Sequence, residues 1–361
     1  MILRNLTTSG FRNLEPARTE FHERANIVVG RNGQGKTNLL EAIYFLATTK
    51  SFRTSRVASL FRFNEANLFV SGAVERDGLQ RTLSAGLEWA EAKRRVLMIN
   101  GEKVALAPYL NALAVFAYSS ARLDVIRGVP EDRRRFLDRG IASLHANYLE
   151  QLSRYLRVLR QRNALLQEIA TNRESPATLG AWDDELTGAA ATIQAARRAY
   201  TAEVQALFDE IVEAHAYHVR GVRIGYTPNE VTGLANLRRA EVRARTSLVG
   251  PQRDVVEFTV DGRPAAEVLS GGEQKMVVLF LKFAKLELFR RRHDDAAVFL
   301  LDDVDAELDL VVLEDLLRRL PQATQVFASS AKEVFLHALE SGPHRRLTVE
   351  SGAVTSLRDF A

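Results

Sequence analysis

The sequence predicts an α/β fold with mixed sheets, joined to a second lobe that consists of a helical hairpin. Three observations predict it. An apolar segment, 25–29, runs straight into the glycine-rich segment 30–37, and an apolar helical pattern follows. Two long segments, 133–171 and 182–215, carry apolar residues at helical spacing. The apolar run 297–301 ends in a pair of aspartates, which is typical of a buried strand with ligand groups at its carboxyl end.

The composition is typical of a soluble globular chain. Of 361 residues, 46% are hydrophobic and 26% charged, so the length suits two domains or one domain with a large insertion. No apolar run reaches the ~20 residues that span a bilayer, so we expect cytoplasmic residence and no membrane partner. The absence of cysteine excludes disulfides, thiolate zinc sites and cysteine nucleophiles. A net charge of +4 is compatible with nucleic acid but is weak evidence for it.

The N-terminal part predicts strands and one helix around the glycine-rich segment. We expect strands within 2–11 and over 25–29, and a helix over 37–46. Three further short apolar segments are expected to be antiparallel strands, because turn signals such as Asp77-Gly78 and Asn100-Gly101 lie beside them. These segments are 67–74, 81–89 and 95–99.

The middle of the chain predicts the helical hairpin. After Pro130, apolar residues at steps of three and four continue from Arg133 to about Thr171, which indicates one long helix. Ser175-Pro176 and Gly180 break the pattern, and a second helix is expected over 182–215. Only a few heptads are present, so we expect a short arm and not a coiled-coil rod.

Charge divides unevenly between these two helices. Residues 133–162 hold eight Arg and two acidic residues, a net charge of +6, whereas residues 174–213 hold eight acidic residues and two Arg, a net charge of −6. One interpretation is that the helices neutralise each other across their shared seam. The other is that Arg154, Arg157 and Arg160, spaced by three, form a stripe that faces a polyanion. The two interpretations are not exclusive.

After about residue 216 the chain returns to strand-like patterns. Strands are expected over 222–226, 255–260 and 298–301, and an apolar helix begins at 276–281. The segment 325–328 is expected to be the last core strand.

The glycine-rich segment has the chemistry of a phosphate-binding loop. Its residues, Gly30-Arg31-Asn32-Gly33-Gln34-Gly35-Lys36-Thr37, match the pattern G-x-x-x-x-G-K-[ST]. The glycines let backbone N–H groups converge on phosphate oxygens, and the start of the following helix adds partial positive charge. Lys36 is expected to reach the β- and γ-phosphates of ATP, and the Thr37 hydroxyl to bind Mg²⁺.

The acidic pair after the apolar run is the expected metal and water site, because α/β sheets bind their ligands at the carboxyl ends of strands. Asp302 is the expected Mg²⁺ partner and Asp303 the group that polarises the attacking water. In isolation, such a pair is as often a helix-capping site as a metal site. The phosphate-binding loop in the same chain favours the metal.

The segment Leu269-Ser270-Gly271-Gly272-Glu273-Gln274 lies about 30 residues before the acidic pair and precedes an apolar helix. Together with that pair it resembles the signature and Walker B segments of ABC-type ATPases, in which a nucleotide is clamped between two heads. The resemblance implies that Ser270, Gly271 and Gly272 offer a hydroxyl and helix N-terminal amides to the γ-phosphate of the partner's nucleotide. Ser270, Lys36 and Asp303 would then be the catalytic residues.

The same resemblance covers three smaller features. ABC-type ATPases usually carry Glu where Asp303 stands, and the shorter side chain implies slow hydrolysis. Glu307-Leu308-Asp309 resembles the loop that crosses the dimer interface, and Ser329-Ser330 occupies the place where relatives sense the γ-phosphate.

Further segments resemble the RecF family of bacterial recombination mediators, and the resemblance extends over most of the chain. In the family's order they are Gly10-Phe11-Arg12-Asn13-Leu14, Lys50-Ser51-Phe52-Arg53, residues 128–138 (G-x-P-E-x-R-R-x-F-L-D), 161–166, 182–186 and Gly250-Pro251-Gln252-Arg253-Asp254. Three departures are present: Ser119-Ser120-Ala121 replaces the usual S-P-E, Gln252 stands where His is common, and the signature is nearer to the general ABC form. None of them removes a phosphate-binding group.

This resemblance implies an ABC-type ATPase head over 1–130 and 216–361, with a helical arm over 131–215. ATP would bring two heads together as a homodimer on duplex DNA near a single-strand gap, and hydrolysis would release them. The family works with RecO and RecR to load the RecA recombinase. DNA contacts should be mostly to phosphates. The candidates are Lys50, Arg53, Arg56, Arg154, Arg157 and Arg160.

Two other functions remain open on the sequence alone. One is the cytoplasmic ATPase subunit of an ABC transporter, although the insertion between Lys36 and Ser270 is long for that class and its usual His after the last strand is missing. The other is a nucleotide-gated scaffold that does not hydrolyse ATP, which the aspartate at 303 keeps open.

Overall fold

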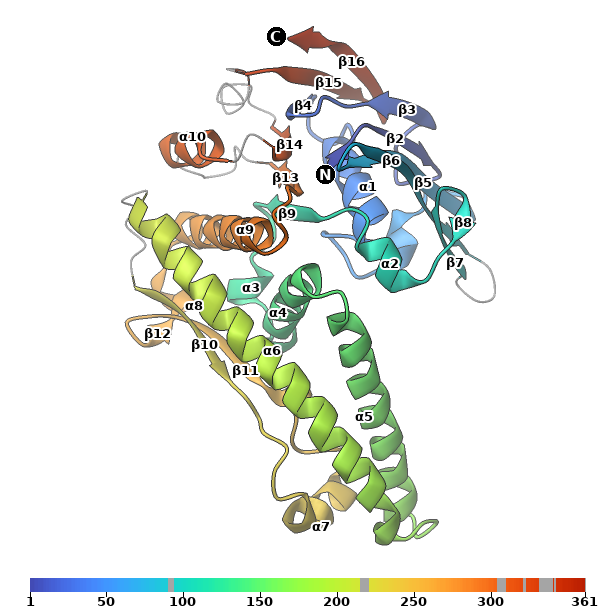
Figure 1. The fold of residues 1–361 in the computed structure, drawn as a ribbon, viewed down its shortest axis with the longest axis vertical. Helices are drawn as coiled ribbons and strands as arrows, with labels where there is room; N and C mark the ends of the chain where they lie inside the picture. The colour runs from blue at the N-terminus through green and yellow to red at the C-terminus, as the bar shows by residue number, and fades with distance from the viewer. Residues whose placement is uncertain are drawn as a thin grey trace. The chain divides into compact units, whose positions relative to one another are not determined.

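The computed structural model describes residues 1–89, 94–214, 221–303, 310–320, 323–330, 340 and 342–360. The chain forms two compact units (Figure 1). The first comprises residues 1–123, 211–218 and 270–361, and the second comprises residues 124–210 and 219–269. The predicted α/β class with mixed sheets and a helical second part is confirmed.

The first unit is built on a six-stranded sheet in the order β16-β15-β4-β14-β13-β9. Its strands are β4 (Ala25–Val29), β9 (Val115–Ser119), β13 (Val298–Asp302), β14 (Gln325–Ser329), β15 (His344–Glu350) and β16 (Ala353–Phe360). All pairings are parallel except that of β16 with β15. Every residue of β4, β13 and β14 is buried, as expected for parallel strands covered on both faces. Helices α1 (Lys36–Thr48) and α9 (Gly271–His293) lie on opposite sides of this sheet (Figure 1).

A second, antiparallel sheet of the same unit covers the other side of α1. Its order is β3-β2-β5-β6-β7-β8, with β1 beside β5. Because α1 contacts β5 and β6 as well as β13 and β14, it lies between the two sheets, and its apolar residues, such as Ile43 and Leu46, are fully buried. The strands are β1 (Ile2–Leu3), β2 (Asn5–Ser9), β3 (Ala17–Glu20), β5 (Asn67–Arg76), β6 (Leu79–Glu88), β7 (Arg94–Ile99) and β8 (Glu102–Lys103). Three short helices belong to this unit: η1 (Val57–Leu60), α2 (Leu106–Leu110) and α10 (Leu310–Arg318).

The second unit consists of helices and a small antiparallel sheet. The helices are α3 (Asp124–Arg127), α4 (Pro130–Leu144), α5 (Tyr148–Ala170), η2 (Pro176–Thr178), α6 (Leu179–Ala214, of which residues 211–214 belong to the first unit), α7 (Leu234–Ala244), η3 (Pro251–Arg253) and α8 (Ala265–Val268). The sheet consists of β10 (Val222–Thr227), β11 (Val255–Val260) and β12 (Arg263–Pro264). α5 and α6 form the predicted hairpin (Figure 1).

The prediction of a single helix from Arg133 to about Thr171 is wrong, because α4 ends at Leu144 and α5 begins at Tyr148. His145 has an extended backbone, with φ −130° and ψ 106°, and this ends α4. Leu144 and Tyr148 are both buried and lie four residues apart. The apolar spacing therefore continues across the break and conceals it.

The prediction that 325–328 is the last core strand is also wrong. β15 pairs in parallel with β4, with Thr348 opposite Val29, and Leu347 and Val349 are buried. Two adjacent arginines, Arg345 and Arg346, interrupt the apolar pattern of this strand in the sequence.

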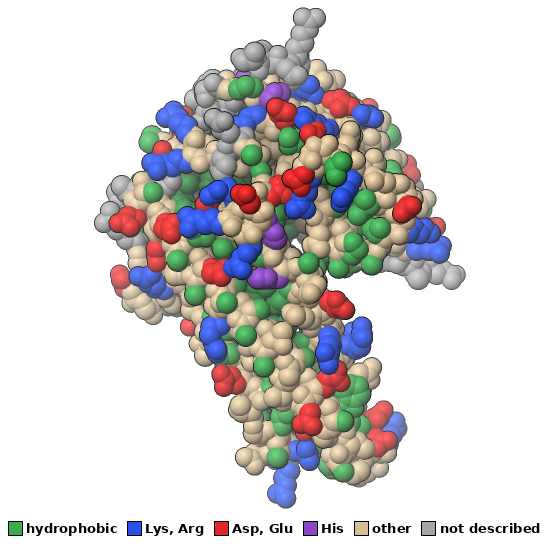
Figure 2. Space-filling model, viewed as in Figure 1, with side chains coloured by type: hydrophobic (Ala, Val, Ile, Leu, Met, Phe, Trp, Pro, Cys, Tyr) green, Lys and Arg blue, Asp and Glu red, His purple; other side chains and the backbone are tan. Residues whose placement is uncertain are grey.

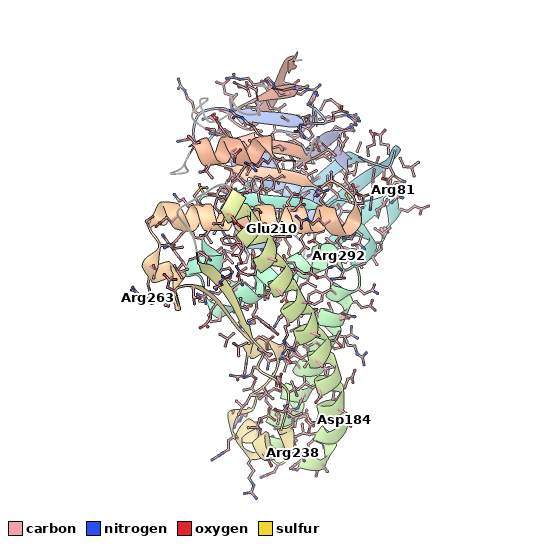
Figure 3. All side chains as sticks on the ribbon, turned by 60° about the vertical axis from the view of Figure 1, so that its left-hand side comes forward. Arg81, Asp184, Glu210, Arg238, Arg263 and Arg292 are labelled. Atoms are coloured by element: carbon pink, nitrogen blue, oxygen red, sulfur yellow. The ribbon has the colours of Figure 1, made fainter. Side chains whose placement is uncertain are left out.

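A fully buried arginine joins the hairpin to α7. Arg162 of α5 donates to Asp183 of α6 (2.8 Å), to Glu241 of α7 (2.5 Å) and to the Ser247 hydroxyl (2.7 Å). Each group compensates a charge or dipole that burial would otherwise leave unpaired. In the same region Arg238 of α7, labelled in Figure 3, pairs with Asp183 at 3.0 Å.

A second buried arginine, Arg197 of α6, pairs with Asp138 of α4 (2.9 Å) and with Asp254 (2.8 Å). These contacts connect residues 219–269 to the helices. The sequence predicts that residues 216–361 belong to the head, whereas the structure groups residues 219–269 with the helices of the second unit. The division into a functional head and a functional arm stays a prediction.

The charge asymmetry of the hairpin is partly neutralised between its helices. Arg154 pairs with Glu185 across α5 and α6 at 3.2 Å, and Arg162 pairs with Asp183 as described above. Arg157 and Arg160 are exposed. Figure 2 shows basic and acidic side chains interspersed on the visible face of this unit, without a continuous basic band. Pairing across the seam therefore accounts for part of the charge pattern.

Candidate nucleotide-binding site

The glycine-rich loop connects β4 to α1, at the carboxyl end of the parallel sheet. Gly30, Gly33 and Gly35 have φ values of +148°, +80° and +121°, which favour glycine. A Cβ on Gly30 would lie 2.4 Å from the carbonyl oxygen of Val349, and one on Gly35 would lie 2.9 Å from Asn13 Oδ1. At Gly33 no atom lies within 4 Å of such a Cβ, so its backbone conformation alone requires glycine.

Lys36, the first residue of α1, folds back over this loop. Its Nζ donates to the carbonyl oxygens of Gly30 (2.8 Å) and Arg31 (3.2 Å) and lies 3.5 Å from Asn32 Oδ1. The side chain is 5% exposed. Its ammonium group and the N-terminal amides of α1 therefore provide positive charge at the loop, as a polyphosphate site requires.

Asp302, the last residue of β13, accepts hydrogen bonds from hydroxyl groups on three neighbouring elements. Thr37 Oγ1 and Ser329 Oγ donate to its Oδ1 at 2.8 and 2.9 Å. Ser119 Oγ donates to its Oδ2 at 3.3 Å. Because β9, β13 and β14 are parallel neighbours, their last residues meet at one edge of the sheet. The substitution of Ser119-Ser120-Ala121 for the usual family segment thus leaves a hydroxyl beside the acidic residue.

Burial, and to a smaller extent the charge of Asp303, raise the pKa of Asp302 to about 6 from an ordinary value of 3.8, although the hydrogen bonds from Thr37 and Ser329 lower it. A cation beside the carboxylate would favour its charged form. One hydroxyl and one carboxylate suit Mg²⁺, which usually takes few protein ligands together with substrate phosphates. The part of the chain that the structure describes has no cluster of three or more His, Asp or Glu side chains suited to another metal.

Asp303 adopts a left-handed backbone conformation, with φ +50°. This conformation costs a non-glycine residue about 1–2 kcal/mol and recurs at functional sites. Its N–H donates to Ser329 Oγ at 3.1 Å, so Ser329 contacts both aspartates. Unlike Asp302, Asp303 is partly exposed.

The signature serine begins α9. Ser270 Oγ accepts from the N–H of Glu273 (3.3 Å), and the Ser270 N–H donates to Glu273 Oε2 (2.7 Å), which is a capping box. Ser270 is exposed, and Gly271 and Gly272 are partly exposed. The positive end of a 23-residue helix is therefore accessible from outside. The Glu307-Leu308-Asp309 segment lies outside the described residues.

The predicted DNA-binding residues have different surroundings. Lys50 and Arg56 are exposed. Arg53 NH1 donates to Asn38 Oδ1 (2.7 Å) and lies 3.6 Å from the fully buried carboxylate of Glu41, so it is fixed next to α1. On α5, Arg157 and Arg160 are exposed and Arg154 is paired, as described above.

Several residues of the site were not singled out from the sequence. Asn13 contacts the loop, Ser119 contacts Asp302, and Glu41 anchors Arg12 through two hydrogen bonds of 2.8 Å. The only sequence signal for Asn13 is its place in the segment that resembles the RecF family. The charge of Glu41 suggests a surface position, and only the structure reveals its burial.

The fold and this arrangement define an ABC-type ATPase head with a largely helical second unit. Residues 2–350 match the family described as the RecF/RecN/SMC N terminal domain. The chain is 32% identical, over 98% of its length and 100% of the relative's, to the DNA replication and repair protein RecF of Geotalea daltonii. It is 31% identical to RecF of Bacillus subtilis, covering 91% of this chain and 93% of that protein.

Solved structures agree. A structure of the recombination mediator protein RecF with ATP, in the RecFOR pathway, has a TM-score of 0.86 at 26% identity and covers 99% of this chain and 98% of that one. An SMC head bound to the C-winged helix domain of ScpA has a TM-score of 0.58 at 15% identity and shares the fold alone. The chain belongs to the RecF family. This membership argues against the alternative that the chain is the ATPase subunit of an ABC transporter. No helix among the described residues is long and apolar enough to cross a membrane.

Proposed function

We propose that this protein is an ATP-dependent, DNA-binding recombination mediator. The observation that carries the proposal is the convergence of Lys36, Thr37 and Asp302 at one edge of the sheet, in a chain that also exposes the start of α9. The curated relatives are named DNA replication and repair proteins, and a solved relative carries ATP. The geometry of the site and the names of the relatives together support ATP binding and hydrolysis by a DNA repair protein.

The residues of the site have different roles in ATP binding and hydrolysis. The amides of residues 30–37 and the ammonium group of Lys36 bind the phosphates. Thr37 and Asp302 would hold Mg²⁺, which would neutralise part of the charge of the phosphates. Asp303 orients and polarises the attacking water. Since aspartate is shorter than the usual glutamate, hydrolysis is slow.

The exposed signature segment supports head-to-head association of two copies. Ser270 and the amides of Gly271 and Gly272 would contact the γ-phosphate bound to the other copy. These contacts exist only in the dimer, so ATP shifts the population toward it. The dimer would hold duplex DNA beside a single-strand gap through phosphate contacts, and RecO and RecR would be partners in loading RecA. On this proposal the exposed Lys50, Arg56, Arg157 and Arg160 are candidates for these contacts, whereas Arg53 and Arg154 pair with Glu41 and Glu185.

A scaffold that binds but does not hydrolyse ATP is the second candidate. The aspartate at 303 favours it, because ABC-type ATPases usually have glutamate there. Turnover of wild type and the Asp303→Asn variant distinguishes the two candidates.

The native mass of the protein in solution tests the proposal. We expect a monomer without nucleotide or with ADP, a dimer with Mg²⁺ and ATP, and a more stable dimer when gapped duplex DNA is added. Ser270→Arg should remove the dimer while leaving ATP binding intact, because the hydrogen bonds of Ser270 lie within the first turn of α9 and not with the phosphate-binding loop. Ser175→Arg is the matched control, since Ser175 is also an exposed serine that caps a short helix. A monomer in every condition would refute the proposed mechanism.

A further inference from the structure

The turn between β15 and β16 contacts the phosphate-binding loop. β15 pairs with β4 up to Thr348 opposite Val29, so the residues that follow each strand lie close together. The N–H of Gly352 donates to the carbonyl oxygen of Gln34 at 2.9 Å. The N–H of Ser351 donates to Gln34 Oε1 at 2.6 Å. Gln34 is thus held by the turn through both its main chain and its side chain.

Asn13 holds the same carbonyl group from another element. Its Nδ2 donates to the Gln34 oxygen at 3.1 Å, and its Oδ1 accepts from Asn38 Nδ2 at 2.7 Å. The carbonyl oxygen of Gln34 therefore accepts two hydrogen bonds, from Asn13 and Gly352, which fix its direction. Asn13 in turn is tied to α1 through Asn38.

The direction of this carbonyl determines the direction of the next amide. In a trans peptide the C=O of one residue and the N–H of the following residue point in opposite directions. With the Gln34 oxygen directed toward Gly352 and Asn13, the N–H of Gly35 is directed to the other side of the loop. The amides of such a loop bind phosphate only when they converge on it.

We propose that the Ser351–Gly352 turn is a positioning element of the phosphate-binding loop. Together with Asn13 it fixes the Gln34–Gly35 peptide and thereby sets the affinity for the phosphates of ATP and ADP. The inference rests on the proposed function, because it concerns the same nucleotide site. Ser351 and Gly352 are positioning residues, since they act through Gln34.

The packing leaves the turn little freedom. Gly352 has φ +88°, and a Cβ on it would lie 1.9 Å from the carbonyl oxygen of Asn13. Its own carbonyl oxygen accepts from the N–H of Glu15 at 2.9 Å. Gly352→Ala must therefore move the turn away from Asn13 and Gln34. Gly78 offers a matched control, because it also lies in a hairpin turn, with φ +72°, but a Cβ there would meet no atom within 4 Å.

The test compares nucleotide affinity with thermal stability in the full-length protein, using fluorescent ATP and ADP as probes. Gly352→Ala should raise the Kd for both nucleotides about ten-fold or more, because two hydrogen bonds to Gln34 are disturbed. Gly78→Ala should lower Tm, because alanine is strained at positive φ, but leave both Kd values within about two-fold of wild type. Gln34→Met keeps the length of the side chain and removes only the acceptor for Ser351, so we expect a rise in Kd of about three-fold or more.

Three outcomes separate the possibilities. If Gly352→Ala and Gln34→Met bind nucleotide as tightly as wild type, the turn is only structural and the inference is wrong. If Gly352→Ala does not fold, a wild-type Kd for Gln34→Met overturns the inference by itself. Failure of the wild-type protein to bind either nucleotide would instead refute the proposed function, and this inference with it.

Discussion

Replacing Asp302 by asparagine should make the nucleotide-free protein more stable at pH 8. The carboxyl group is 2% exposed, and burial raises its pKa to about 6 from an ordinary 3.8. Each pKa unit corresponds to about 1.4 kcal/mol, so the charged carboxylate destabilises the native state by about 3 kcal/mol above pH 6. Asparagine has the same shape without the charge. Its oxygen can accept from Thr37 and Ser329, and its amide can donate to Ser119.

The sign of the pH dependence follows from proton linkage. Between about pH 4 and pH 6 the native protein binds more protons at Asp302 than the unfolded chain does, so its stability falls as the pH rises through this window. Below pH 4 the group is protonated in both states and the penalty is absent. The advantage of Asp302→Asn should therefore be largest at pH 8 and nearly absent at pH 4.

The assay is thermal unfolding of both proteins at pH 8 and pH 4, without nucleotide and then with Mg²⁺ and ATP. A difference of about 3 kcal/mol corresponds to about 6–12 °C in Tm for a unit of this size. With Mg²⁺ and ATP the order should reverse, because the wild-type carboxylate gains a cation and the amide does not. Equal Tm values at pH 8 without nucleotide, or an advantage that persists undiminished at pH 4, would refute the reasoning.

Two further predictions concern a buried charge and the second aspartate. Arg162→Met should destabilise the second unit by about 3–5 kcal/mol in urea unfolding, because it leaves Glu241 buried without its partner. Adding Glu241→Gln should recover part of the loss, and no recovery would contradict the charge argument. Asp303→Asn should lower phosphate release about 100-fold or more while ATP-dependent dimers persist, because asparagine cannot take a proton from water. Unchanged turnover would remove Asp303 from the proposed mechanism.

The parts of the site that the sequence predicted have local signals. A phosphate-binding loop requires glycine at fixed spacing, because Gly30, Gly33 and Gly35 have positive φ values that other residues rarely adopt. Similarly, a parallel strand covered on both faces requires a continuous apolar run, which made β13 and the position of Asp302 recognisable. These constraints act within a few residues and are readable without the fold.

The parts that were missed depend on contacts between distant segments. Ser119 and Asp302 lie 183 positions apart and meet only because β9 is the neighbour of β13. Ser351 and Gln34 lie 317 positions apart and meet only because β15 is the neighbour of β4. Strand order in a parallel sheet is not encoded in the local pattern of any one strand. The same holds for Glu41 of α1, whose buried charge is compensated by Arg12 from the turn that follows β2.

In the nucleotide-free site, several groups are in energetically unfavourable states that a bound ligand would compensate. The charge of Asp302 is disfavoured by burial, the backbone of Asp303 is left-handed, and the first residues of α9 are exposed or partly exposed beside the capping box of Ser270 and Glu273. Mg²⁺ would relieve the first of these within one copy. The last would be compensated by a phosphate bound to the other copy. On the proposed function, part of the binding free energy of ATP is therefore available only when two heads meet, which makes association depend on the triphosphate and weaken once the γ-phosphate is lost.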